Sequence, residues 1–363
     1  MMKRKSWAGV IVMLFAAAVT IVACSKKSET KDNGPSVNGF DKAGMLVNYA
    51  DNLIIPAYTS LQQKILLLET TTNTFLTTPN TTNQTALKAV FKDAYLQFEH
   101  VSVAQFGPAE SVLLNNFLNT FPTEKAPINM NISNGTYNLA SNSTIGQQGF
   151  PALDYLLFGT DAITRLTGAN AANAKKYVQD VIARMKTLNA GVLDTWKNTY
   201  RATFVANTRS DASSPLALLV NQFAFEMDQL KGPRIGWPFG KQSAGVQYPE
   251  NVEGYASGIS VALAVENLTS LKAMFNGNGS GKGMSDYLVA LNKTQLSTDV
   301  TKQFDVAINA LNTVPDPLST ALSANKPQIE AAYKEVQILL TLIKTDVASA
   351  TGVRITYQDT DGD

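Results

Sequence analysis

The sequence predicts an all-α protein built from two antiparallel helical bundles. Apolar residues recur every three or four positions over most of the chain, which is the spacing that lines one face of a helix. Short polar connectors separate these long periodic segments, as they do between the helices of antiparallel bundles. Strand-like patterns are scarce, and short extended pieces are expected only at 129–137 and 353–357.

Two long segments carry the clearest helical pattern. From Leu87 to Val101, and again from Ile329 to Val347, apolar side chains are spaced by three and four residues. A further helix is expected at 42–71, kinked or interrupted at Pro56, because proline removes a backbone hydrogen bond. The other expected helices span 146–158, 171–193, 215–230, 252–275, 284–291 and 298–312.

The polar segment 207–214 is the predicted joint between the two bundles. The first bundle then covers residues 40–207 and the second bundle covers 208–358. An acidic tail follows at 359–363.

A short sequence pattern occurs once on each side of this joint. Phe98-Glu99 comes shortly before Gly107-Pro108, and Phe225-Glu226 comes shortly before Gly232-Pro233. Both Phe-Glu pairs lie late in an expected helix that the Gly-Pro pair then ends. Divergent duplication is therefore a hypothesis for the origin of the two bundles.

Residues 1–23 have the pattern of an export signal. A basic start precedes an apolar stretch that ends at Ala23, and the chain turns polar directly after Cys24. Cys24 is the only cysteine of the chain, and it stands where lipoprotein signal peptides are cleaved and acylated. We therefore expect a lipid anchor on Cys24, followed by a flexible tether over 24–39. The alternative is an uncleaved membrane helix, for which the apolar stretch is short.

The charge balance of the chain limits which kinds of molecule it is expected to bind. Loss of the basic leader leaves 27 basic and 29 acidic side chains, and this near-neutral balance argues against nucleic acid as a partner. The expected location is the cell envelope, with the anchor in the outer membrane and the protein facing the periplasm. Ser25 after Cys24 is typical of this location.

His100 is the only histidine of the chain. A zinc site that needs several imidazoles is therefore excluded, and so is a thiolate site once Cys24 is acylated. A metal site would rest mainly on carboxylates, which suit hard cations such as a calcium or a ferric iron ion. The sequence does not name a cofactor beyond this iron-or-calcium class.

The chain resembles the imelysin family over about residues 40–358. The resemblance implies an all-helical fold of two bundles, a bacterial envelope location, and a link either to iron acquisition or to a proposed metallopeptidase activity. The segments that carry it are Gln105-Phe106-Gly107-Pro108, 145–159 (IGQQGFPALDYLLFG), 231–240 (KGPRIGWPFG), 248–257 (YPENVEGYAS) and 345–353 (TDVASATGV).

The family motif Gly-x-His-x-x-Glu is degenerate in this chain. Its glycine is Gly149, but the histidine position is Pro151 and the glutamate position is Asp154. Proline offers no ligand atom and suits the first turn of a helix. The pair of proposed metal ligands is thus reduced to one shorter carboxylate, and Asp154 is the remaining candidate metal ligand.

Several other residues are candidates for a ligand site. Glu99 and His100 are neighbours on one helix, so they point about 100° apart and do not easily face one point. Arg234 and Lys241 are the cationic candidates to pair with Asp154, if this carboxylate points inward. Glu253 and Tyr255 are expected at the start of the next helix, where Glu253 would favour the positive helix end.

Three functions from different classes follow. The first is a non-catalytic binding or accessory lipoprotein for iron or other nutrient acquisition, with a metal ion or small-molecule ligand between the bundles. The second is a metallopeptidase of the imelysin type with an atypical site. The third is an envelope protein that binds a protein partner and no small ligand. The missing motif histidine favours the first.

Overall fold

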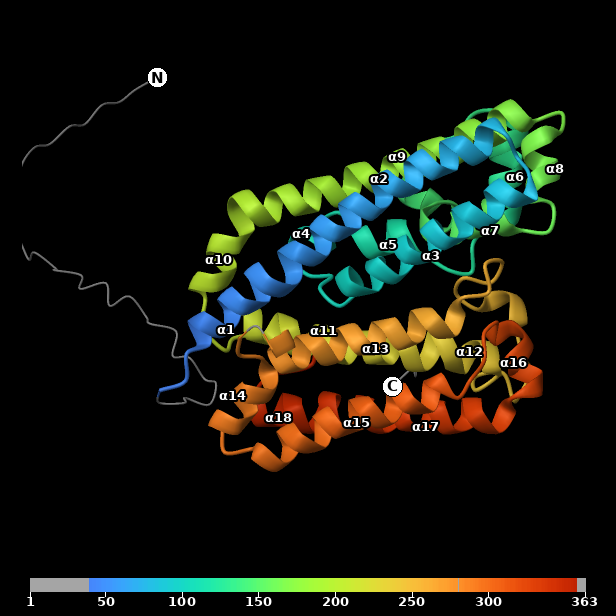
Figure 1. Ribbon diagram of the computed structural model, residues 1–363. Helices are drawn as coiled ribbons and strands as arrows, with labels where there is room; N and C mark the ends of the chain where they lie inside the picture. The colour runs from blue at the N-terminus through green and yellow to red at the C-terminus, as the bar shows by residue number, and fades with distance from the viewer. Residues whose placement is uncertain (1–38, 280, 358–363) are drawn as a thin grey trace, which may run out of the picture. The chain divides into compact units, whose positions relative to one another are not determined.

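Helices make up the regular structure of the chain in a computed structural model, which describes residues 39–279 and 281–357 (Figure 1). The all-α prediction is confirmed, since no strand occurs in these two ranges. The predicted extended pieces are wrong. Lys125–Asn134 is helix α6, in which Ile128 and Ile132 bury one face, and 353–357 has no regular structure. The predicted leader, Cys24, most of the tether and the acidic tail lie outside the described residues.

The first half of the fold is formed by α1 to α10. Helix α2 packs against α3 and α9 to form its long framework. Shorter helices pack along this framework, and α5, α6, α7 and α8 all contact α9. The bounds are α1 Lys42–Asn48, α2 Ile55–Thr77, α3 Thr81–Ser102, α4 Pro108–Ser111, α5 Leu114–Asn119, α7 Gly149–Phe158, α8 Ala162–Thr167, α9 Ala171–Thr195 and α10 Arg201–Ala206.

The chain stays helical through Pro56. The residue lies in the first turn of α2, directly after a π-helical turn at Tyr49–Ile54. Proline has no N–H to donate and its ring crowds the preceding turn, so a wider turn before it keeps the helix continuous. The predicted interruption is thus a local change of helix type.

The second half is formed by α11 to α18. Helix α15 packs against both α13 and α17. The bounds are α11 Pro215–Gln229, α12 Trp237–Phe239, α13 Ser260–Asn276, α14 Met284–Ala290, α15 Thr294–Asn312, α16 Leu318–Ala324, α17 Lys326–Thr341 and α18 Ala348–Thr351.

Two expectations for this half are wrong. The pair Gly232-Pro233 does not end the helix that carries Glu226, because a π-helical turn at Leu230–Gly236 continues α11 and leads into α12. Residues 252–259 are not the start of a helix, since α13 begins only at Ser260. Gly254 and Gly258 adopt φ values of +60° and +68°, which break a regular helix. Glu253 therefore cannot act on a helix N-terminus.

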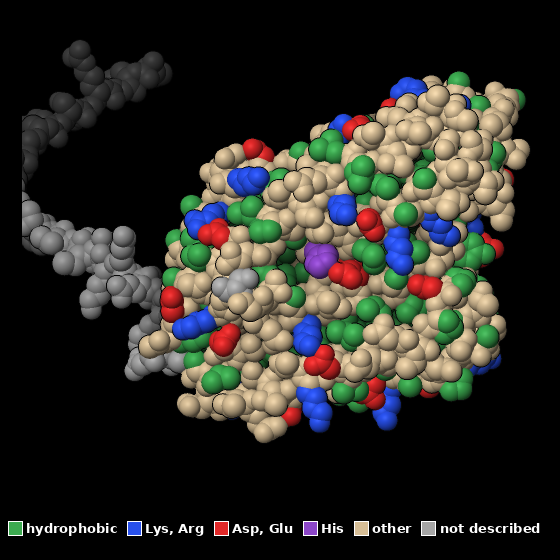
Figure 2. Space-filling view, viewed as in Figure 1, with side chains coloured by type: hydrophobic (Ala, Val, Ile, Leu, Met, Phe, Trp, Pro, Cys, Tyr) green, Lys and Arg blue, Asp and Glu red, His purple; other side chains and the backbone are tan. Residues whose placement is uncertain are grey.

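Helices α3 and α13 pack against each other and join the two halves. On the surface of this seam, His100 Nε2 lies 2.6 Å from Glu266 Oε1. Figure 2 shows the histidine, in purple, beside an acidic side chain. Across the described ranges, no helix combines the length and the apolar character needed to cross a membrane. The domain boundary at 207/208 stays a prediction.

Candidate functional site

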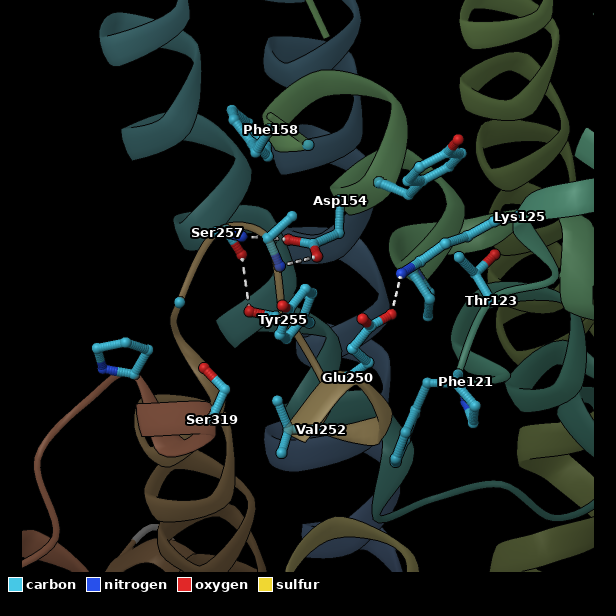
Figure 3. Close-up of a pocket in the computed structure, with 18 of the residues that line it drawn as sticks. Phe121, Thr123, Lys125, Asp154, Phe158, Glu250, Val252, Tyr255, Ser257 and Ser319 are labelled. Carbon is cyan, nitrogen blue, oxygen red and sulfur yellow. Dashed lines mark hydrogen bonds and ion pairs between the residues drawn. The ribbon is translucent and has the colours of Figure 1, made fainter. Parts of the chain in front are cut away.

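A cavity of about 610 Å³ lies between the two halves (Figure 3). From the first half, α3, the segment 121–125 and α7 contribute to its wall. From the second half, the segment 250–258 and the start of α16 complete it. The degenerate motif therefore borders the largest described cavity, because Pro151 and Asp154 both line it.

Gly149 fixes where α7 begins. Its φ is +76°, a conformation that residues with a side chain rarely adopt. A Cβ atom at this position would lie 2.3 Å from the backbone oxygen of Leu118. Only glycine therefore lets α7 start this close to α5. Gly149 is a geometric element of the site and offers no side chain to a ligand.

Asp154 is bound by backbone amides of the other half. Its Oδ2 accepts a hydrogen bond from the N–H of Ala256 at 2.7 Å, and its Oδ1 accepts one from Ser257 at 2.8 Å (Figure 3). Burial raises the pKa of Asp154 above its usual value, although these donors favour the charged form. The predicted partners, Arg234 and Lys241, are wrong, since Lys241 pairs with Glu330 at 2.6 Å and Arg234 pairs elsewhere.

The motif region does not fit a metal ion. Pro151 has no donor atom, and both oxygens of Asp154 already accept backbone hydrogen bonds. Nor do three His, Cys, Asp or Glu side chains gather as metal ligands anywhere in residues 39–279 and 281–357. A hard cation would need several free oxygen ligands. The weak assignment of Asp154 as a metal ligand thus has no geometric support.

The mouth of the cavity carries a lysine between two tyrosines. Lys125 Nζ lies 5.4 Å from the ring centre of Tyr255 and 6.0 Å from that of Tyr155. The same ammonium is 2.7 Å from Glu250 Oε2, and this ion pair links the two halves. The pair lowers the pKa of Glu250 through a hydrogen bond from Lys125. Tyr255 is thus placed at the cavity, as the sequence suggested for a ligand-binding residue.

Behind the cavity wall, three glutamates surround one arginine. Arg234 Nη1 lies 2.7 Å from Glu99 Oε2 and 3.3 Å from Glu253 Oε2. Its Nη2 lies 3.9 Å from Glu226 Oε2. All four side chains are buried, with at most 6% of any of them exposed. A single positive charge therefore faces three carboxyl groups away from water.

Neutral side chains complete this acidic cluster, which we define as Glu99, Glu226, Glu253 and Arg234. Asn267 Nδ2 donates to Glu99 Oε2 at 2.9 Å and to Glu226 Oε2 at 3.0 Å. Asn119 Nδ2 donates to Glu253 Oε1 at 2.7 Å. The donors come from both halves, so the cluster joins them.

The surroundings of Glu99 and Glu226 favour their protonated forms by raising the pKa of both groups. Burial raises the pKa of Glu99 to about 8, with repulsion from the other glutamates adding to it and Arg234 opposing it. Burial likewise raises the pKa of Glu226 to about 7. Burial disfavours the charged form of Arg234, but the three carboxylates outweigh it and raise its pKa. Glu99 Oε1 is buried and makes no hydrogen bond to any described residue.

The predicted site residues thus fall into separate places. Pro151, Asp154 and Tyr255 line the cavity, and Gly149 begins the helix that carries the first two. Glu99, Arg234 and Glu253 meet in the buried cluster. His100 lies apart on the seam and pairs with Glu266.

Sequence reasoning missed Glu226 as a member of the cluster. The one available signal was the echo of Phe98-Glu99 in Phe225-Glu226, because both glutamates of this echo reach Asn267 and Arg234.

Fold and site together define a class: an all-helical protein of two joined bundles, with a cavity and a buried acidic cluster at the joint. The sequence pattern of the Imelysin family (Peptidase M75) matches residues 54–345, and the chain belongs to this family.

Similar proteins agree with this assignment. Iron-regulated protein A of Synechococcus elongatus is 19% identical over 303 residues, which are 80% of this chain and 81% of that protein. An imelysin-like protein from Psychrobacter arcticum superposes with a TM-score of 0.71 at 18% identity, covering 89% of this chain and 100% of the other. A structure named as an iron-regulated protein A precursor from Parabacteroides distasonis gives a TM-score of 0.70 at 17% identity, covering 87% and 98%. At these identities the solved structures establish the fold alone.

Proposed function

We propose that this chain is a lipid-anchored binding protein of the cell envelope that serves iron or other nutrient acquisition. Its ligand binds in the cavity between the two halves. The observation that supports this proposal is the cavity itself, because its volume of about 610 Å³ falls within the range of small-molecule sites. The names of the similar proteins connect them with iron regulation, and this is the reason for placing iron first.

A binding role is favoured over the metallopeptidase alternative. Metal-dependent hydrolysis needs a cation with an open coordination position held by several side chains. At the motif, Pro151 offers no ligand and the oxygens of Asp154 are occupied by Ala256 and Ser257. The motif therefore has a structural role: it forms part of the cavity wall, and Asp154 holds the segment 250–258 in place.

The proposed binding can be tested by blocking the cavity. The full-length protein is purified from membranes in mild detergent, and its melting temperature is measured with ferric citrate, haem, a ferric catecholate or calcium. A ligand that binds only the folded state raises the melting temperature. Ser319 lines the cavity, and Ser319→Trp fills it. The matched control is Thr320→Trp, at the next and exposed position.

We expect at least one iron compound to raise the melting temperature of the wild type and of Thr320→Trp, but not of Ser319→Trp. A shift that persists in Ser319→Trp would place the ligand elsewhere. No shift with any iron compound would favour the envelope interaction protein, whose partner is another protein.

The anchor has its own test. Cys24→Ser removes the thioether on which acyl chains are carried, and two or more chains are needed for stable attachment. We expect the wild type in the outer-membrane fraction and Cys24→Ser in the soluble periplasmic fraction or retained with its leader. An unchanged distribution would contradict lipidation at Cys24.

A further inference from the structure

The carboxyl groups on the cavity wall all have partners. Asp154 accepts two backbone hydrogen bonds. Asp161 binds Arg165 Nη2 through both oxygens, at 2.9 and 2.7 Å. Glu250 pairs with Lys125 at 2.7 Å. Each carboxylate on the described wall is thus already engaged by a donor of this chain.

Lys88 is the exception among the charged groups of the wall. This exposed lysine on α3 lines the cavity and makes no ion pair or hydrogen bond within residues 39–279 and 281–357. Its one charged neighbour on the wall is Asp154, whose pKa the lysine charge lowers without a direct contact. The hydroxyl groups of Thr160, Tyr255 and Ser319, which also line the cavity, make no hydrogen bond to any described residue. The groups that remain available on the wall are therefore an ammonium and three hydroxyls, all of which can donate to an anionic oxygen.

Aromatic side chains form much of the remaining wall. Phe121, Tyr155, Phe158 and Tyr255 all line the cavity. Phe158 comes from α7, and Tyr255 belongs to the segment that Asp154 holds (Figure 3). Aromatic walls favour flat apolar groups, which stack on them or meet their edges. The cavity thus combines an aromatic lining with one unpaired positive charge.

From this combination we infer that the cavity takes a small molecule in which an anionic oxygen group is attached to an aromatic ring, and that Lys88 binds the anionic group. The inference rests on the proposed function and names the class of its ligand. The ring lies among the four aromatic side chains, and the hydroxyls of Tyr255 and Ser319 add hydrogen bonds. The ion pair with Lys88 is exposed, so binding weakens as salt is added.

Three probes of nearly equal size separate charge from shape. They are 2-naphthoate, its neutral amide, and the cationic 2-naphthylmethylamine, titrated by calorimetry into the full-length protein in mild detergent. The protein variants are Lys88→Ala, the charge-conserving Lys88→Arg, and Lys302→Ala. The last is a control, because Lys302 is an exposed lysine on α15 that lines none of the described cavities.

We expect naphthoate to bind up to about fivefold more tightly than its amide, because an exposed ion pair is worth less than one power of ten in affinity. The preference disappears in Lys88→Ala and is kept in Lys88→Arg and in Lys302→Ala. The amine binds most weakly.

Three results would overturn the inference. The first is an amide that binds as tightly as the acid, and the second is a preference for the acid that persists in Lys88→Ala. The third is an iron compound that binds in the cavity while none of the naphthyl probes does. In each of these cases the proposed function survives if Ser319→Trp abolishes the binding that is seen. If no probe and no iron compound binds, both the inference about the ligand class and the proposed binding function are contradicted.

Discussion

The segment 250–258 contacts two buried acidic sites that are built on different principles. Asp154 is stabilised by two backbone N–H groups, whereas Glu99, Glu226 and Glu253 share the one guanidinium of Arg234. Backbone donors hold a single carboxylate without an ion pair, and the charge of Lys88 adds only a weaker attraction. One arginine cannot neutralise three carboxylates, so the cluster retains protons instead. Buried carboxyl groups in one fold can thus serve different ends. Backbone N–H donors make one a structural contact, whereas a shared guanidinium leaves the others with raised pKa values.

The largest effect is expected from removing the shared cation. Arg234→Gln leaves three buried carboxyl groups without a positive charge, and loss of one partner from a buried ion pair costs about 3–5 kcal/mol. Urea denaturation should show a loss of this size. In the matched control Arg201→Gln, the pair with the partly exposed Asp51 is broken, and such pairs are worth at most about 1 kcal/mol. If both variants lose the same free energy of unfolding, burial does not make the ion pairs of Arg234 more important than the exposed pair of Arg201.

A smaller effect is expected at the other acidic site. Asp154→Asn keeps the shape of the side chain but turns one acceptor into a donor that faces a backbone N–H. An unsatisfied buried group of this kind costs about 1–3 kcal/mol. We expect urea denaturation to show this loss, together with weaker binding in the cavity because the segment that carries Tyr255 loosens. A variant that keeps full stability would show that the amides of Ala256 and Ser257 do not need the carboxylate.

The pH dependence of stability distinguishes the two principles further. In the folded state the pKa of Glu99 is raised to about 8 and that of Glu226 to about 7, while in the unfolded chain both are near 4.5. The folded state then binds more protons between pH 4.5 and 8, so its free energy of unfolding falls as pH rises through this window.

We expect the free energy of unfolding to fall by at least about 1 kcal/mol between pH 5 and 8, since each pKa unit corresponds to about 1.4 kcal/mol. Glu99→Gln removes one titrating group and should make this slope shallower. An unchanged slope in Glu99→Gln would mean that other groups cause the pH dependence.

The smallest effect is expected on the surface of the seam. His100 and Glu266 are partly exposed, at 38% and 30% of their side-chain areas, and exposed ion pairs contribute at most about 1 kcal/mol. His100→Ala should therefore change the free energy of unfolding by less than this amount and leave ligand binding in the cavity unchanged. A large loss of ligand binding in His100→Ala would instead show that His100 contributes to the ligand site.

The periodicity of the sequence predicted the helices well, because burial of one helix face is a local pattern. The expected helix at 171–193 forms as α9, Ala171–Thr195, and the expected helix at 215–230 forms as α11, Pro215–Gln229. The start of α13 was predicted eight residues too early. There, the apolar Val252 and Ile259 imitate a helix face, but Gly254 and Gly258 at positive φ and the bonds from Asp154 hold the segment in turns.

The candidate site was only partly predictable. Glu99, Arg234 and Glu253 were candidates, but nothing local indicates that they meet, since the contact joins three distant parts of the chain. The charge of Asp154 led to the expectation of a cationic partner. Backbone N–H groups can fill the same role, and no residue type signals them in a sequence. Tertiary packing of the two halves decides both outcomes.

Gly149 has a consequence for how divergent chains of this kind are recognised. Its lack of a Cβ is required by the approach of α7 to Leu118, and this requirement is independent of what stands two or five residues later. Histidine can therefore give way to Pro151 and glutamate to Asp154 while the two helices keep their spacing. A search that requires the complete Gly-x-His-x-x-Glu motif would therefore miss this chain. A search for the glycine in its helical surroundings would still find it and would leave its chemistry to be determined separately.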